Sequence, residues 1–236
     1  MKLGISQPTF LPWAGYFGLI SYTGKFVILD NIRFNKRSWQ QRNNIKLNDK
    51  NFLLTVPVIS KNRFKQNINE VMIDKKRNFI DNHRKIIEHN YKRSKYYSLY
   101  SNLIFDAYSS KHNKLIDLNL SFIKLICEIL EIKFPFILSS SLQISESKDK
   151  LIIDICKKMK CKEYVSTIGA KEYLTNEDNF NKNNIKLNFF GFKNTNYQQL
   201  GTKFLKNLSI IDLLFNLGPN TLQYITENFY INEKEN

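Results

Sequence analysis

The stretch "LDNIRFNKRSWQQRNNIK" holds the densest group of side chains that could do chemistry. Asp30 is a single carboxylate among lysines and arginines, and Arg33 and Arg42 could hold a pyrophosphate through bidentate hydrogen bonds. Trp39 could stack on a base or on the apolar face of a sugar. Asn43 could hydrogen-bond sugar hydroxyls or a reacting carbonyl. The pattern favours a site for a phosphorylated, ring-shaped ligand, and a solvated basic loop is the alternative.

Two further groups of polar and aromatic residues follow predicted strands. Gln7 opens "QPTFLPWAGYF", whose prolines and glycines indicate a strand-to-helix turn, and Trp13 and Tyr16 could form one wall of a pocket. Ser166 ends the predicted strand "KEYVST". Because ligands of open α/β sheets bind at the carboxyl ends of the strands, we expect these residues to share one edge with Asp30.

His83 is the candidate general base, because histidine is the usual proton-transfer group near neutral pH. In "NFIDNHRKIIEHNY" it shares a helical face with Phe79, Ile86 and Ile87. A buried structural histidine is the alternative. If His83 is catalytic, Asp30 would orient either its ring or the attacking amine.

The composition is basic, with 36 Lys and Arg against 21 Asp and Glu and a formal net charge of +15. This charge fits a polyanionic partner such as tRNA or an acidic acyl carrier protein, or a small phosphorylated ligand. An A/T-rich coding sequence would also enrich lysine and asparagine without any such partner.

Other features exclude several classes of protein. No apolar run is long enough to span a membrane, and the N-terminus is unlike a signal peptide. Three cysteines, an odd number, suit a reducing compartment, so we expect a cytoplasmic protein. No His or Cys spacing indicates a metal site, and no P-loop occurs. The sequence therefore predicts no metal and no bound cofactor.

Strand and helix patterns predict a single α/β domain over residues 1–236. We expect a Rossmann-like, mostly parallel sheet with a helical insertion near residues 76–132. Strands are predicted at 2–6, 25–30, 51–59, 68–74, 134–144, 163–166 and 184–192. Gly24 should end the first helix, Ser147 and Ser209 should begin later ones, and a short helix should open with "IGAKEYL".

The first strand, loop and helix resemble in outline those of nucleotidyltransferase-like folds. There, a histidine pair flanking a glycine at the helix start binds nucleotide phosphates. Here "WAGY" stands in that place, and Trp13 and Tyr16 cannot supply the imidazole electrostatics. The similarity therefore supports the fold more than adenylyl transfer.

Over nearly its full length the chain resembles the WbqC-like family. The matching stretches are "QPTFLPWAGYF", "FVILDNIRFNKRSWQQRNNIK", "LLTVPV", the segment from His83 to Tyr91, "YVSTIGAKEYL" and "NYQQLGTKFLKNLSIIDLLFNLG". One departure is Asn78-Phe79, where the family usually has a tryptophan. The resemblance implies a part in O-antigen or related polysaccharide biosynthesis, with aminoacyl, specifically glycyl, transfer to an amino sugar as a proposed role. The positions that it carries over are Gln7, Trp13, Tyr16, Asp30, Arg42, Asn43 and His83.

Together these observations predict a transferase that moves an acyl or aminoacyl group to the amine of a nucleotide-linked amino sugar. The donor could be an aminoacyl-tRNA, a carrier-protein thioester or a coenzyme A thioester. A non-catalytic module that binds a nucleotide sugar or nucleic acid is one alternative, and a nucleotidyltransferase-like enzyme is another.

Overall fold

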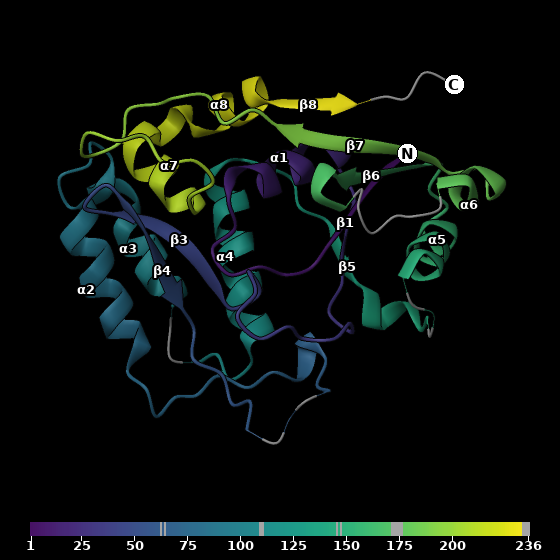
Figure 1. The fold of residues 1–236 in the computed structure, drawn as a ribbon, viewed down its shortest axis with the longest axis horizontal. Coiled ribbons are helices and arrows are strands. Elements are labelled where there is room, and N and C mark those ends of the chain that lie inside the picture. Colours follow the sequence, from purple (N-terminus) through teal and green to yellow (C-terminus); the bar gives the residue numbers. More distant parts are fainter. Residues whose placement is uncertain are drawn as a thin grey trace.

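A mostly parallel, six-stranded sheet forms the centre of the computed structural model, which describes residues 1–61, 63, 65–108, 111–144, 146, 148–170 and 177–232 (Figure 1). Its strand order is β5-β2-β1-β6-β7-β8, and only β8 runs antiparallel to its neighbour. The strands are β1 (Lys2–Ser6), β2 (Phe26–Ile28), β5 (Phe136–Leu138), β6 (Glu163–Thr167), β7 (Lys186–Phe192) and β8 (Phe229–Asn232). This arrangement confirms the predicted Rossmann-like α/β fold.

Alternating side chains bury both faces of the sheet. On β2, Phe26 and Ile28 face one apolar core, whereas Val27 faces a second. The first core also contains residues of α1 (Ala14–Thr23), α4 (Leu115–Ile129), α7 (Ile210–Leu217) and α8 (Thr221–Asn228). The second contains residues of α5 (Lys148–Lys158) and α6 (Glu177–Lys182). Helices therefore cover the sheet on both sides, as parallel strands require.

Helix α1 joins β1 to β2 and ends where the sequence predicts. Gly24 has φ +68, and its N–H donates to the Ile20 carbonyl at 3.2 Å. A residue with a side chain adopts this left-handed conformation only at a cost, so glycine ends the helix. The short helix lets β2 return parallel to β1.

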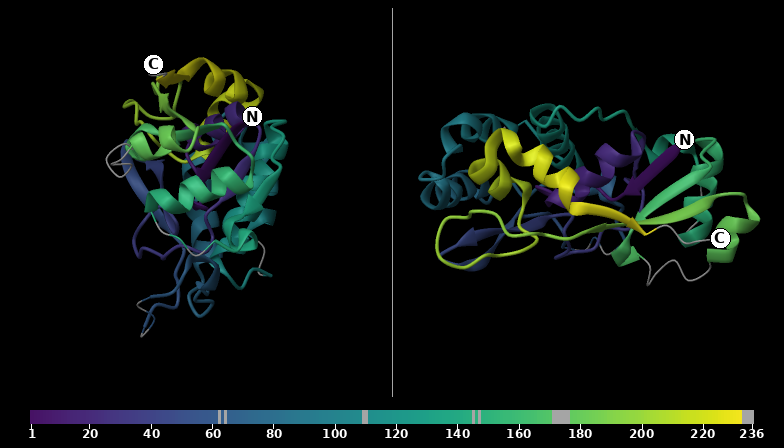
Figure 2. Two further views of the ribbon diagram at one scale, coloured as in Figure 1. Left: turned by 90° about the vertical axis from the view of Figure 1, so that its right-hand side faces the viewer. Right: turned by 90° about the horizontal axis from the view of Figure 1, so that it is seen from above.

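The predicted helical insertion consists of α2 (Phe79–Tyr91), α3 (Tyr97–Ala107) and α4. Helices α2 and α3 lie at one end of the molecule, α5 and α6 lie at the other, and α4 lies between them (Figures 1 and 2). On α2, Phe79, His83 and Ile87 are buried and Ile86 is partly buried, so the predicted apolar face is confirmed.

The strand expected at 51–59 does not join the main sheet. Instead, β3 (Arg42–Leu47) and β4 (Lys50–Thr55) pair with each other as an antiparallel hairpin. Asn48 and Asp49 connect them with φ of +48 and +58, the conformation of a two-residue type I′ turn. Because of this tight turn, β4 pairs with β3 and not with a strand of the main sheet.

The prediction of a strand at 68–74 is also wrong for the first three residues. Residues Ile68–Glu70 form a single 3-10 turn, because Asn67 and Glu70 cap each other's backbone groups at its start. Isolated bridges follow, from Ile73 to Val58 and from Met72 to Lys114.

Helices α6 and α8 and strand β8 were not predicted. Ser147 and most of "IGAKEYL" (171–174) fall outside the described residues.

Ser209 precedes α7 as predicted, but its side chain does not cap the helix. Among the described residues, no helix has the length and apolar character needed to cross a bilayer.

Candidate functional site

The sheet reverses its direction of strand addition at β1, which lies between β2 and β6. Such a switch point leaves a crevice beyond the carboxyl ends of the two strands, where ligands of open α/β sheets bind. We call the residues that follow the strands at this edge the rim: 7–13 after β1, 30–41 after β2, 139–142 after β5 and 168–170 after β6.

Two of these rim segments are joined by hydrogen bonds. The Gln40 side-chain amide donates to Gln7 Oε1 at 2.6 Å and accepts from the Asn35 backbone N–H at 3.0 Å. The Phe10 N–H donates to the Trp39 carbonyl at 3.0 Å. These contacts fix the rim after β1 against the rim after β2. Gln40 is a residue that sequence reasoning missed, although it lies within "SWQQRN".

Asn43 and Asn119 hold the same segment from beneath. The Asn43 amide donates to the Phe10 and Leu11 carbonyls at 3.2 and 2.7 Å. The Asn119 amide, on α4, donates to the carbonyls of Pro8 at 3.1 Å and Gln40 at 2.8 Å. Both side chains are buried, so Asn43 shapes the rim rather than facing open solvent. An asparagine on the apolar face of a helix was the available sequence signal for Asn119.

Asp30 is 2% exposed and hydrogen-bonded through both carboxylate oxygens. Oδ1 accepts from the Ser139 hydroxyl at 3.0 Å and the Ser140 N–H at 2.8 Å. Oδ2 accepts from the Ser140 hydroxyl at 2.6 Å and the Asn69 amide at 3.3 Å. Asp30 thus ties the segment after β2 to the segment after β5. Its neighbours in space are these serines and an amide, brought from distant parts of the chain, so sequence alone could not pair them.

Trp13 and Tyr16 turn inward at the start of α1. The Trp13 ring lies over Gly15, where an added Cβ would come within 2.3 Å of it, and edge-on to Phe192 with centroids 5.5 Å apart. Tyr16 is buried, its ring packs against Phe26, and its hydroxyl donates to the Gln7 carbonyl at 3.2 Å. Burial raises the pKa of Tyr16 far above its usual range, so this hydroxyl stays a donor. Both rings support the rim from below.

Three predicted ligand-binding residues keep exposed or unsatisfied groups. Trp39 is 54% exposed, the largest exposure among the large apolar side chains of the rim. Arg33 is exposed, and its backbone bridges to that of Asn67. Arg42 Nε is buried and has no hydrogen-bond partner among the described residues. Buried donors without a partner are rare in folded proteins, which favours a water or a ligand beside Arg42.

Two more buried oxygens, Thr9 Oγ1 and Asn119 Oδ1, also have no hydrogen-bond partner within the described part of the chain. Both lie in or next to the first rim segment. Ser166, at the end of β6, is buried and accepts a 3.1 Å hydrogen bond from the Tyr164 hydroxyl. An exposed indole thus lies in the rim, and unsatisfied polar atoms lie in the rim or next to it.

His83 lies in a separate aromatic cluster rather than on the rim. Its ring contacts Phe10, Phe79 and Tyr108, and Nδ1 lies 3.2 Å from the Tyr108 hydroxyl. Burial lowers the pKa of His83 to about 4, against a smaller opposing effect of a hydrogen bond to the Thr55 backbone. The ring is therefore neutral at pH 7. The polar partners of His83 and of Asp30 are different residues, and no hydrogen bond joins the two in the described structure.

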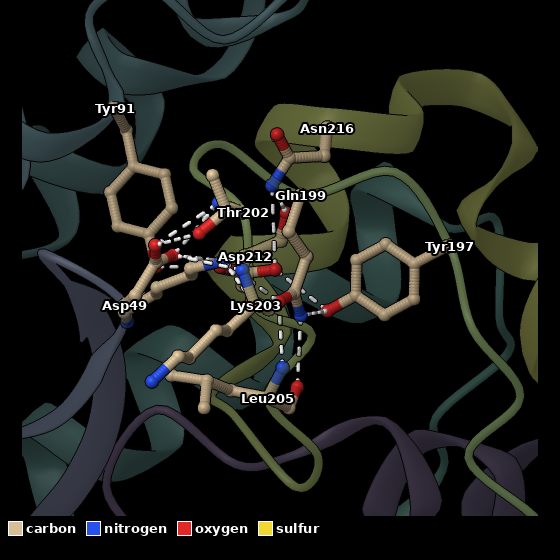
Figure 3. Close-up of polar contacts among 10 residues, drawn as sticks. Asp49, Tyr91, Tyr197, Gln199, Thr202, Lys203, Leu205, Asp212 and Asn216 are labelled. Carbon is tan, nitrogen blue, oxygen red and sulfur yellow. Dashed lines mark hydrogen bonds and ion pairs between the residues drawn. The ribbon is translucent and has the colours of Figure 1, made fainter.

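A second polar cluster surrounds Asp212, on α7 (Figure 3). Its carboxylate accepts from the hydroxyls of Tyr91 at 2.8 Å and Tyr197 at 2.6 Å, and from the Asn216 amide at 3.3 Å. The pKa of Asp212 is raised because burial disfavours the charged carboxylate. The hydrogen bonds from the two tyrosines and the nearby Lys46 ammonium oppose this effect but are smaller. The cluster joins α2, α7 and the segment before α7.

Asp49 fixes that segment from the hairpin turn (Figure 3). Its carboxylate accepts from the Thr202 N–H, the Thr202 hydroxyl and the Lys203 N–H, and pairs with the Lys46 ammonium at 3.0 Å. These bonds hold the pKa of Asp49 well below its usual range. Neither Asp49 nor Asp212 was predicted as a site residue. An aspartate inside the apolar stretch "LSIIDLLFNLG" was the one available signal for the latter.

The sheet is Rossmann-like, and a polar rim lies at its switch point, the position where open α/β sheets bind ligands. The chain belongs to the WbqC-like protein family, whose model matches residues 7–224. It is 31% identical over 226 residues to "Uncharacterized protein Rv1507c" of Mycobacterium tuberculosis (strain ATCC 25618 / H37Rv), a match that covers 95% of this chain and 97% of that protein. No solved structure matches.

Proposed function

We propose that the protein is a cytoplasmic transferase of surface-glycan biosynthesis that moves an acyl or aminoacyl group, such as glycyl, to the amine of a nucleotide-linked amino sugar. Membership of the WbqC-like family supports a biosynthetic role. The observation that carries the proposal is the exposed Trp39 on the rim, followed closely by Arg42, the first residue of β3, whose guanidinium has an unsatisfied Nε. An indole face and a guanidinium together suit a nucleoside diphosphate.

The reaction would not require a strong protein base to remove the proton from the amine. The neutral amine attacks the acyl carbon of an ester or thioester, the bond to oxygen or sulfur breaks, and the leaving group takes the proton that the amine loses. The rim would then contribute by holding the amine and the acyl carbon together. Gln7 and Arg33 would bind the sugar and its phosphates, with Asn43, Tyr16, Trp13 and Ser166 shaping the site.

The catalytic roles of His83 and Asp30 remain predictions. His83, with its pKa of about 4, is neutral at pH 7 and could accept a proton, but as a weak base. Asp30 could act by keeping the rim in place, because its hydrogen bonds join two rim segments.

The test is product formation from a nucleotide-linked amino sugar with each of three donors: an aminoacyl-tRNA, a carrier-protein thioester and a coenzyme A thioester. Trp39→Ala and Arg42→Lys should each lower kcat/KM at least tenfold. Leu99→Ala removes an equally exposed apolar side chain from α3, away from the rim, and should change nothing. Activity that survives Trp39→Ala, Arg42→Lys, His83→Ala and Asp30→Ala undiminished would reject the site.

A non-catalytic nucleotide-sugar binding module is the second candidate. It is favoured by one observation: the carboxylate of Asp30 is fully hydrogen-bonded, and the ring of His83 lies in a different cluster. A saturable rise in melting temperature with nucleotide sugars, without turnover of any donor, would support this candidate. A comparable rise with nucleoside triphosphates alone would instead favour a nucleotidyltransferase-like enzyme.

A further inference from the structure

Two of the three cysteines, Cys156 and Cys161, meet where helix α5 ends. Lys160 has φ +51, and its N–H donates to the Lys157 carbonyl at 2.9 Å. The Cys161 N–H donates to the Cys156 carbonyl at 2.8 Å. These two bonds form a Schellman motif, which commonly brings the side chains of its outer two residues into contact. Here both of those residues are cysteines, and both belong to the second core.

A hydrogen bond between the two thiols makes them unequal. It raises the pKa of Cys156, which is the donor, and burial raises that pKa further. It lowers the pKa of Cys161, which is the acceptor, and the Glu163 N–H and the Met1 ammonium lower it further. Burial and the Glu163 carboxylate oppose the shift of Cys161 but are smaller. Cys161 is therefore the thiol that ionises first, while Cys156 keeps its proton.

The two thiols also differ in access to solvent. Cys161 is 6% exposed and Cys156 is 0% exposed. The Cys161 sulfur lies among backbone groups: it accepts from the Glu163 N–H at 3.3 Å, and its S–H donates to the carbonyls of Glu163 at 2.9 Å and Met1 at 3.5 Å. A small oxidant would thus reach the pair at Cys161. Cys156 needs no access of its own, because its reaction partner lies against it.

The remaining cysteine, Cys127, provides an internal comparison. It lies on α4 in the first core, whereas the pair lies in the second, on the opposite face of the sheet. Its side chain is buried, and burial raises its pKa to about 12. A buried thiol with a raised pKa is inert, since the thiolate is the reactive form.

We propose that Cys156 and Cys161 are a redox-modification site, at which a peroxide converts the two thiols reversibly into a disulfide. A thiolate beside a second thiol is the arrangement of redox-sensing cysteines. Disulfides of this transient kind also occur in reducing compartments. The site goes beyond the transferase proposal and does not depend on it, because the pair shares no residue with the rim.

The chemistry has two steps. The Cys161 thiolate attacks one peroxide oxygen, the O–O bond breaks, and a sulfenic acid forms as hydroxide leaves. The Cys156 sulfur then attacks the sulfenic sulfur, so that the S–S bond forms and the S–O bond breaks. The departing hydroxyl takes the Cys156 proton and leaves as water. Two thiols are thus oxidised by two electrons while one hydrogen peroxide is reduced to two waters, and a dithiol reductant reverses the bond by exchange.

Peptide mapping of the native wild-type protein tests the proposal. The protein is treated with hydrogen peroxide at pH 7, blocked with iodoacetamide and digested with trypsin without reduction. Trypsin cuts between the two cysteines, so the disulfide would join peptide 151–157 to peptide 161–162. The joined species is about 2 Da lighter than the two reduced peptides together. We expect this species, its disappearance with dithiothreitol, and about tenfold less oxidation at Cys127.

Three variants assign the steps. Cys156→Ala should leave a sulfenic acid on Cys161 that dimedone traps, and Cys161→Ala should leave Cys156 unoxidised. Cys127→Ala, an equal truncation at another buried cysteine, is the matched control and should form the disulfide as the wild type does. The wild-type digest keeps the test valid if a variant does not fold. Three results would each overturn the proposal: no joined peptide, a joined peptide that appears only after unfolding in urea, or equal oxidation at Cys127.

Discussion

The hydroxyl of Tyr91 donates a 2.8 Å hydrogen bond to the carboxylate of Asp212, across 121 positions of the chain. The same hydroxyl accepts from the Lys46 backbone N–H at 3.0 Å. One phenol thus links the end of α2, strand β3 and helix α7. All three residues are buried, so neither of its partners can turn to water instead.

Tyr91→Phe should therefore destabilise the protein by about 1 to 3 kcal/mol, the cost of leaving buried polar groups without a partner. The aromatic ring and its contact with Phe215 remain. Urea unfolding measures the change. Tyr230→Phe, at an exposed position, should stay within about 0.5 kcal/mol. Equal stability of the two variants would contradict the role of this bond.

Stability should fall in acid through His83. Its pKa is lowered to about 4 in the folded state from 6.5, so between these values the unfolded chain binds the proton and the folded chain does not. Its contribution is present above pH 6.5 and is lost as the pH falls toward 4, by about 3 kcal/mol. His83→Gln should flatten the unfolding free energy against pH over this window. His89→Gln, on the exposed face of the same helix, should retain the wild-type slope.

Gly201→Ala should lower the melting temperature. Gly201 has φ +88, and a Cβ there would lie 2.2 Å from Asp49 Oδ1, within the bonds that fix residues 201–203. Strain of this kind costs about 1 to 3 kcal/mol. Gly169→Ala is the control, because nothing lies within 4 Å of its added Cβ. A melting temperature for Gly201→Ala equal to that of the control would show that the turn adapts freely.

Asp30→Asn should cost about 1 to 3 kcal/mol, since one carboxylate oxygen becomes an amide that cannot accept from its present donors. Differential scanning calorimetry gives the value. Asp106→Asn, on the exposed face of α3, should be neutral within about 0.5 kcal/mol. If Asp30→Asn proved equally neutral, the serine and amide contacts would not be what joins the rim segments.

Periodicity and capping residues made much of the fold predictable. The β-α-β unit from Lys2 to Ile28 could be read from a strand, a helix ending at Gly24 and a second strand. The pairing of residues 51–59 could not be predicted, because an apolar strand has the same sequence pattern in a hairpin and in a larger sheet. Only the type I′ turn at Asn48 and Asp49 decides between them, and "ND" is a weak signal for it.

The candidate site was predictable in part. The loops that follow β1 and β2 could be selected from the clustering of Gln7, Arg42 and Trp39. The inward orientation of Tyr16 could not, because tyrosine suits both a core and a pocket wall. The serines that bind Asp30 lie 109 and 110 positions away, and no local pattern pairs residues at that separation.

The central place of β1 in the sheet sets the order in which the protein can assemble during synthesis. Lys2 opposes Glu163, so one edge of β1 stays unpaired until β6 has been synthesised, 161 residues later. At ribosomal speeds of about 5 to 20 residues per second, that wait lasts roughly 10 to 30 s. An apolar strand edge open for so long can pair with other chains. We therefore expect nascent chains that stop before β6 to aggregate or to be bound by chaperones, whereas full-length chains, which also supply the core residues of α7 and α8, fold.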